Sequence, residues 1–313
     1  MVDGPVDTLL LCVWYLRAKE REAEGFSLAI EGALSCLGIT VILQFEPLDM
    51  VYLTDVFANF LDANQVDGAS LFVCIVTEGS SSEGGGLWWI EDEVNQYHET
   101  LDNLYRLCFH GTEESLISRF HRRAVLQLAC GVGLDAMGVQ DLNKWTNRDV
   151  IDDLIAPTNL AFHPAQVTGC VVSLAVLMYY QGRSLESSLP EAWLRDERAR
   201  QHTDFLLLRS GHEPSALVWS PRNRPFGRDL EFCPCEHRVK GRWHHKKTKM
   251  IVKFQTEHLY QCRGCNAFLR ALITRPDDFD LIDTCDTQYV VCSWPIREIS
   301  MSTEFLPSRQ ATM

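Results

Sequence analysis

Short, almost fully apolar runs are the feature that most constrains the fold of this chain. Three of them, Thr8–Tyr15, Ser70–Val76 and Ala124–Cys130, have the length of strands and lack the polar alternation of strands that face water. Segments with helical spacing, Phe26–Leu37 and Thr54–Ala63, lie between the first two. Such alternation is typical of α/β proteins with a mostly parallel sheet. We therefore expect an α/β sandwich in the N-terminal part of the chain.

The segment after the strand Ser70–Val76 is rich in glycine and serine. Gly79–Gly86 predicts a flexible loop at the edge of the sheet where α/β proteins build their sites. A helix is expected from Ile90 to Leu107, with the acids Glu91–Glu93 in its solvated first turn. Recognition of a basic substrate residue by these acids is the alternative. A short strand is expected at Leu160–Phe162. Further strands are expected at Ile39–Gln44, Phe205–Leu208 and Tyr289–Trp294.

Charge and cysteine content limit the classes of function. The 313 residues carry a net charge of −13, which argues against extensive nucleic-acid binding because phosphate contacts need clustered Lys and Arg. The first residues lack the basic stretch and long apolar run of a signal peptide, and Thr8–Tyr15 is too short to span a bilayer. We therefore expect a cytoplasmic protein, with the nucleus as the alternative location, and no membrane partner. The 12 cysteines then predict reduced thiols or metal ligands instead of disulfides.

Cys130 and Glu78 occupy similar places in two expected strands. Cys130 ends an apolar run and precedes Gly131, which would present its thiol at a strand tip. Glu78 and Gly79 follow the strand Ser70–Val76 in the same manner. In caspases the base histidine lies about 50 residues before the nucleophilic cysteine. Glu78 stands at that spacing here.

These motifs resemble the large-subunit core of the caspase and metacaspase clan of cysteine peptidases. Leu71–Gly79 resembles the family's apolar strand that ends in Ser-His-Gly, and Gln127–Gly131 is similar to its Gln-Ala-Cys-Arg-Gly. Leu37–Ile39 resembles the family's Leu-Gly-Phe before the second strand. The resemblance spans Thr8 to Ser210. It implies a caspase-like three-layer sandwich with a mostly parallel central sheet.

The chemistry of Cys130 has three interpretations. Peptide hydrolysis by a cysteine needs a thiolate, and a histidine supports that thiolate in the resembled family. The negative charge of an ionised Glu78 disfavours the thiolate and with it ordinary proteolysis. In the first, Cys130 is a buried residue at a strand end with no catalytic role. In the second, it belongs to a degenerate protease that keeps a binding groove. In the third, it is a nucleophile whose base is a histidine from elsewhere in the chain. His163 is the best candidate for that histidine, and His110 is a weaker one. In an active enzyme, the resemblance implies a thioester at Cys130 and an oxyanion held by turn amides near Gly79 and Cys130.

Arg17 and the tryptophans 88–89 also have two interpretations each. Arg17 follows the first strand, near the place where the resembled family has an arginine that grips an acidic side chain. A surface arginine is the alternative. The tryptophans either line a groove or anchor their loop on the core.

Two groups of metal-ligand residues lie in the C-terminal part. They are Cys233, Cys235 and His237, followed by Cys262 and Cys265. Two close pairs of thiols separated by a loop are typical of zinc knuckles, in which each pair supplies two corners of a tetrahedron. His237, His244 or His245 is an alternative to one of the thiols. Four protein ligands leave no position for water, so we expect structural Zn²⁺; cysteines without metal are the alternative.

The sequence therefore predicts two parts. Residues 1–210 are expected to form the caspase-like α/β domain, and 211–313 a C-terminal extension with a zinc-binding segment at 233–265. Prolines and arginines after Ser210 predict a linker or an extended arm. The run 237–249 has no acidic residue, and it fits either nucleic-acid contact or a solvated hairpin.

The expected function is that of an impaired or pseudo cysteine endopeptidase. The resemblance implies a role in intracellular regulation or in cell-death or stress signalling, with a protein or peptide partner. The alternative is a zinc-dependent nucleic-acid-binding or protein-interaction module without catalytic activity.

Overall fold

The strands and helices of the chain are seen in a computed structural model. It describes residues 6–49, 53–64, 68–82, 85–92, 95–228, 230–231, 233, 243–283, 288–297 and 299–306. The chain divides into two compact units, Met1–Pro214 and Ser215–Met313. Within the described residues, none of the helices combines the length and apolar character needed to cross a membrane.

Six strands of the N-terminal unit follow each other in the order β9-β8-β7-β3-β1-β2. They are β1 (Thr8–Tyr15), β2 (Thr40–Pro47), β3 (Ser70–Val76), β7 (Arg122–Leu128), β8 (Asp153–Pro157) and β9 (Phe205–Arg209). All neighbours pair parallel except β9, which runs antiparallel to β8. Strands β3 and β7 are buried along their whole length, because both faces of the sheet are covered. The prediction of an α/β fold with a mostly parallel sheet is confirmed.

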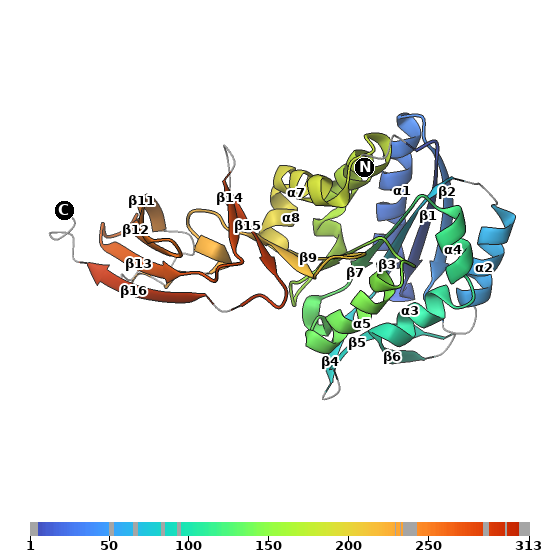
Figure 1. Ribbon diagram of the computed structural model, residues 1–313, viewed down its shortest axis with the longest axis horizontal. Helices are drawn as coiled ribbons and strands as arrows, with labels where there is room; N and C mark the ends of the chain where they lie inside the picture. Colours follow the sequence, from blue (N-terminus) through green and yellow to red (C-terminus); the bar gives the residue numbers. More distant parts are fainter. Residues whose placement is uncertain are drawn as a thin grey trace. The chain divides into compact units, whose positions relative to one another are not determined.

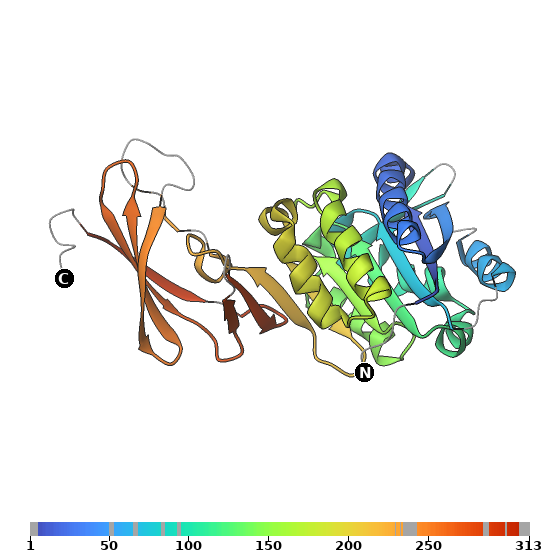
Figure 2. The ribbon, with the colours of Figure 1, turned by 90° about the horizontal axis from the view of Figure 1, so that it is seen from above.

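Helices cover this sheet in two groups. They are α1 (Glu20–Cys36), α2 (Leu53–Ala63), α3 (Leu101–Phe109), α4 (Glu113–Arg119), α5 (Ala136–Asn147), α6 (Thr168–Ala175), α7 (Leu185–Arg195) and α8 (Glu197–His202). Helix α6 contacts both α1 and α7, while α3 contacts both α2 and α5. Figure 1 shows α1 and α7 above the strands and α3 and α5 below them, and Figure 2 looks onto the α1 side.

An aromatic cluster joins the sheet to the helices below it. Trp14 of β1 meets Phe57 of α2 with ring centroids 5.1 Å apart, and Phe57 meets Phe109 of α3 at 5.9 Å. Phe109 in turn lies 6.0 Å from Trp145 of α5. All four side chains are almost completely buried. Aromatic pairs at such distances add to the free energy of burial, so this cluster fixes α2, α3 and α5 against β1.

Residues 79–100 differ from the sequence-based expectation. They form a three-stranded antiparallel sheet of β4 (Gly79–Ser82), β5 (Gly85–Glu91) and β6 (Gln96–Thr100). The predictions of a flexible loop and of a helix from Ile90 were wrong, since α3 begins only at Leu101. Trp88 and Ile90 are buried while Trp89 between them is half-buried, which is the two-residue period of a strand.

The predicted strand at Leu160–Phe162 was also wrong. The strand at this place in the sheet is β8, and residues 160–161 form a turn after it. The pattern Asp-Leu-Ile-Ala-Pro of β8 contains only three central apolar residues. Its burial comes from pairing with β7 on one side and β9 on the other, which a short apolar run does not reveal.

The C-terminal unit is built from β-strands. Strands β14 (Asp280–Asp283), β15 (Gln288–Ser293) and β10 (Ser215–Trp219) pair antiparallel in that order. A second antiparallel sheet contains β11 (Trp243–Val252), β12 (Gln255–Cys262), β13 (Phe268–Thr274) and β16 (Ser300–Leu306). The segment expected to be a linker thus includes β10, because Ala216, Leu217 and Val218 are buried.

Candidate functional site

The register between β3 and β7 places Glu78 and Cys130 at corresponding strand tips. The two strands pair from Ser70 opposite Arg122 to Val76 opposite Leu128. One further backbone bond follows, in which Thr77 N donates to the Leu128 oxygen at 3.1 Å. Because parallel strands end at the same edge of a sheet, the residues that follow both strands share this edge.

Cys130 contacts Gly79, the first residue of β4. The Gly79 amide donates a hydrogen bond to the Cys130 Sγ at 3.2 Å, and the thiol donates to the Gly79 oxygen at 3.2 Å. In the described part of the chain, both hydrogen bonds of this sulfur are with Gly79. A Cβ on Gly79 would lie 2.5 Å from the Cys130 oxygen, so only glycine fits here. The structure therefore brings Cys130 and Gly79 together, and the amide expected to hold an oxyanion is bonded to the sulfur itself.

Glu78 forms an ion pair with Lys19, which no sequence motif indicated. Lys19, in the short 3₁₀ turn after β1, places its Nζ 2.7 Å from the Glu78 Oε1. Burial lowers the pKa of Lys19, but the hydrogen bond and the charge of Glu78 outweigh it and raise the pKa above the ordinary value, with smaller contributions from Glu22 and Cys130. Lys19 therefore stays protonated and compensates the charge of Glu78. We call Lys19, Glu78, Gly79 and Cys130 the Cys130 rim.

His163, the candidate base, has its own partners. It precedes a 3₁₀ turn after β8, and its side chain is more than half exposed. The His163 Nδ1 lies 3.7 Å from the Glu22 Oε2 of α1, and its backbone amide donates to the His202 Nε2 at 2.7 Å. No hydrogen bond joins His163 to Cys130 among the described residues. His110, the weaker candidate, is the C-terminal cap of α3.

Arg17 is held by two buried carboxylates. Its Nη2 lies 3.1 Å from the Asp49 Oδ2, and its Nη1 lies 3.5 Å from the Glu91 Oε1. The Arg17 backbone amide also donates to the Glu91 Oε1 at 2.7 Å. Glu91 is therefore a buried partner at the end of β5, and its prediction as part of a solvated helical turn was wrong. These bonds hold the ends of β1 and β5 together. The guanidinium group of Arg17 is therefore paired with carboxylates of the protein itself.

The loop after Cys130 depends on glycine. A Cβ on Gly131 would lie 2.2 Å from the Thr158 oxygen, and one on Gly133 would lie 2.2 Å from the Trp88 Nε1. The Gly131 amide donates to the Asn159 oxygen at 2.8 Å. The loop therefore packs directly on the backbone that follows β8. Trp88 is buried against the loop, as expected for an anchor on the core.

We expect Gly131→Ala to destabilise the N-terminal unit by about 1–3 kcal/mol, because backbone atoms must move to admit the methyl group. Gly32→Ala is the matched control, since nothing lies within 4 Å of a Cβ there and Gly32 is inside α1. The control should be stabilised by about 1 kcal/mol. Urea unfolding of both variants checks this. Equal midpoints for the two variants would contradict the packing of the loop.

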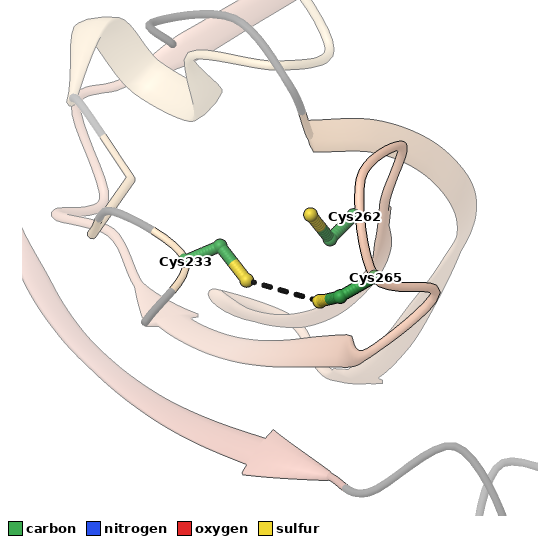
Figure 3. Close-up of side chains that lie close together, drawn as sticks. All are labelled: Cys233, Cys262 and Cys265. Atoms are coloured by element: carbon green, nitrogen blue, oxygen red, sulfur yellow. Dashed lines mark hydrogen bonds between the residues drawn. The ribbon is translucent and has the colours of Figure 1, made fainter. Parts of the chain in front are cut away.

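A cluster of three cysteines forms the second candidate site. The sulfurs of Cys233, Cys262 and Cys265 all lie within 4.8 Å of one another. The Cys233 and Cys265 sulfurs are 3.5 Å apart and face each other in Figure 3. Tetrahedral zinc with bonds of about 2.3 Å to sulfur separates its thiolates by about 3.8 Å. The spacing therefore fits ligands of one metal ion and is far too long for a disulfide.

The turn between Cys262 and Cys265 also favours a metal. The Gly264 amide donates to the Cys262 Sγ at 3.3 Å, a hydrogen bond that supports a thiolate. Cys233 and Cys262 are buried with Trp243, Tyr260 and Leu269, while Cys265 is exposed.

The other predicted ligands fall in two groups. Cys235 and His237 lie outside the described residues. His245 lies on β11 with its Nε2 2.8 Å from the Thr248 Oγ1. The imidazole of His245 is thus hydrogen-bonded to a hydroxyl group. Among the described residues, the three close cysteines are the group that could hold a metal ion.

No family model and no curated protein matches the chain. Among solved structures, the crystal structure of the Drosophila initiator caspase Dronc is similar to it. The sequence identity is 10% and the TM-score is 0.40, over 67% of this chain and 83% of that chain.

Proposed function

We propose that the protein is a caspase-like relative of cysteine peptidases that no longer hydrolyses peptide bonds and binds a protein or peptide partner at the Cys130 rim. The observation that carries this proposal is the ion pair between Glu78 and Lys19. Glu78 follows β3 at the position that corresponds to Cys130 after β7. A base at this position must accept a proton from the thiol. A carboxylate already bonded to an ammonium group is poorly suited to that task.

The rim remains suited to binding. Glu78 is about half exposed at 52%, and Lys19 stays charged beside it. Two opposite charges at the end of a parallel sheet are able to recognise polar groups of a bound chain. The motif resemblance alone supports a role in intracellular regulation or in cell-death or stress signalling.

Peptide hydrolysis tests the loss of catalysis. Peptides with Asp, Glu, Lys or Arg before the scissile bond are incubated with the unchanged protein and with Cys130→Ala. We expect equal, background rates of cleavage. Cleavage that disappears in Cys130→Ala would contradict the proposal.

A peptide array tests the binding role separately. Lys19→Ala removes the ammonium group of the rim, whereas Arg21→Ala removes an exposed charge two residues away. We expect Lys19→Ala to lose the peptides that the unchanged protein binds and Arg21→Ala to keep them. Equal binding by both variants would place the partner elsewhere.

For the C-terminal unit we propose a structural Zn²⁺ bound by Cys233, Cys262 and Cys265, with Cys235 or His237 as the fourth ligand. The three convergent sulfurs and the amide hydrogen bond to Cys262 support it. Bound zinc would hold the β12–β13 turn and the segment before β11 together. Elemental analysis of purified protein is expected to give one zinc per chain.

A further inference from the structure

The C-terminal unit contains a cavity that none of the functions above uses. Its volume is about 360 Å³, within the range of small-molecule sites. The lining residues are Ser220, Arg222, Pro225, Phe226, His245, Thr248, Thr256, His258, Leu281 and Gln288. Three of them are apolar and the others are polar, a combination that suits a ligand with an apolar body and a polar head group.

One wall is a continuous chain of hydrogen bonds across β11 and β12. The Thr248 Oγ1 lies 2.8 Å from the His245 Nε2 and 3.1 Å from the His258 Nδ1. The Thr256 Oγ1 lies 3.0 Å from the His258 Nε2. When the His258 Nε2 carries the proton and donates to Thr256, the Thr256 hydroxyl keeps its own hydrogen to donate to a ligand.

The lining contains one permanent charge, and it is positive. Burial lowers the pKa of His258 to about 4, with a smaller contribution from His245. Burial also lowers the pKa of His245, and Arg222 and His244 act in the same direction. Both imidazoles are therefore neutral at pH 7, and Arg222 is the charged group at the cavity. No lining residue is acidic, so the cavity favours an anion over a cation.

The apolar part of the lining includes a residue in a strained conformation. Phe226 has φ 52°, in the left-handed region that a bulky residue rarely adopts. Its backbone amide donates to the Ser220 Oγ at 2.7 Å, which holds the turn. Strained residues of this kind are concentrated at ligand-binding sites. Pro225 and Phe226 thus add a fixed apolar part to the lining of the cavity.

We propose that this cavity binds a small organic anion, with its phosphate or carboxylate head group on Arg222 and the Thr256 hydroxyl and its apolar body against Phe226. The site is independent of the Cys130 rim and of the cysteine cluster, since it shares no residue with either. A phosphate monoester and a carboxylic acid present the same chemistry to Arg222. The geometry therefore defines the ligand as a compact aromatic or aliphatic acid.

Titration calorimetry with the full chain tests the site with phenyl phosphate, benzoate and the neutral benzyl alcohol. We expect at least one of the two anions to bind, and benzyl alcohol to bind at least about tenfold more weakly. Arg222→Gln should weaken anion binding at least about tenfold. Arg228→Gln, an exposed arginine outside the lining, is the matched control and should bind as the unchanged protein does.

Imidazole resonances locate the binding. Phenyl phosphate or benzoate should shift the signals of His245 and His258 and leave that of His98, in the other unit, unchanged. Thr256→Val should weaken binding without loss of folding. The proposal is overturned if neither anion binds, or if benzyl alcohol binds as tightly as both anions. Equal anion affinity of the Arg222→Gln and Arg228→Gln proteins would also overturn it. So would His245 and His258 signals that do not shift when the anions are added.

Discussion

Replacing Cys262 and Cys265 with serine is expected to unfold the C-terminal unit and to leave the protein without zinc. Structural zinc contributes about 10–16 kcal/mol of apparent binding free energy, which in small sites is also folding free energy. Serine hydroxyls do not replace thiolates as ligands at neutral pH. The buried residues around the cluster, such as Tyr260 and Leu269, would lose the turn that covers them. Proteolysis followed by mass spectrometry should find new cleavage sites between residues 230 and 306.

Cys36→Ser is the control for this experiment. Cys36 is an exposed cysteine at the end of α1 and belongs to no cluster of the described residues. Its variant should retain one zinc per chain and the original cleavage pattern. Full zinc content in the Cys262→Ser, Cys265→Ser protein would show that the three close sulfurs do not hold the metal.

Asp153→Ala is expected to destabilise the N-terminal unit by about 3–5 kcal/mol. Arg122 at the start of β7 and Asp153 at the start of β8 form a buried ion pair, with the Arg122 Nη2 3.0 Å from the Asp153 Oδ2. The Arg122 Nε donates to the same oxygen at 3.2 Å. Alanine would leave the guanidinium group buried, and the backbone oxygen of Arg183 would be its remaining acceptor in the part of the chain that the structure describes. Urea unfolding measures the loss.

Two further variants distinguish a broken buried pair from a general loss of charge. Asp141→Ala breaks an exposed pair with Lys144 on α5 and should change stability by less than about 0.5 kcal/mol.

Burial raises the pKa of Asp153 more strongly than Arg122 lowers it, so the pair of Arg122 and Asp153 itself stabilises the fold little. Arg122→Met combined with Asp153→Ala should therefore recover part of the loss. A double variant less stable than Asp153→Ala alone would contradict this account.

The strands of the parallel sheet could be predicted because a strand that is buried on both faces is almost entirely apolar in sequence. Thr8–Tyr15 and Ser70–Val76 were predicted with the bounds that the structure has. Their apolar runs have no other stable place in a folded chain. The shared position of Glu78 and Cys130 also follows from the spacing of two parallel strands.

The sequence did not reveal features that depend on contacts between distant segments. Residues 79–86 look flexible by composition and a helix was expected from Ile90, yet the strands of this region pair with one another and Trp88 is buried against Gly133. Lys19 became part of the rim only because β1 ends at the same edge as β3. A basic residue soon after a buried parallel strand is the signal that could have identified it.

The second cysteine pair was predictable and the cavity was not. The spacing of Cys262 and Cys265 is by itself typical of a turn that could hold a metal ion. The cavity needs His258 of β12, Arg222 after β10 and Leu281 of β14 to meet, and these residues share no sequence motif. Histidines on a polar strand indicate no particular ligand until the other residues that line the cavity are known.

Alkylation of Cys130 tests most directly whether the rim has lost its catalytic function. Peptidyl acyloxymethyl ketones with Asp or Arg next to the reactive group are incubated with the full chain, and adducts are counted by peptide mass spectrometry. Cys36 serves as the internal standard, because it is an exposed cysteine at the end of α1. We expect Cys130 to be modified no faster than Cys36. Modification of Cys130 more than about tenfold faster than Cys36 would show an activated nucleophile and contradict the loss of peptidase activity.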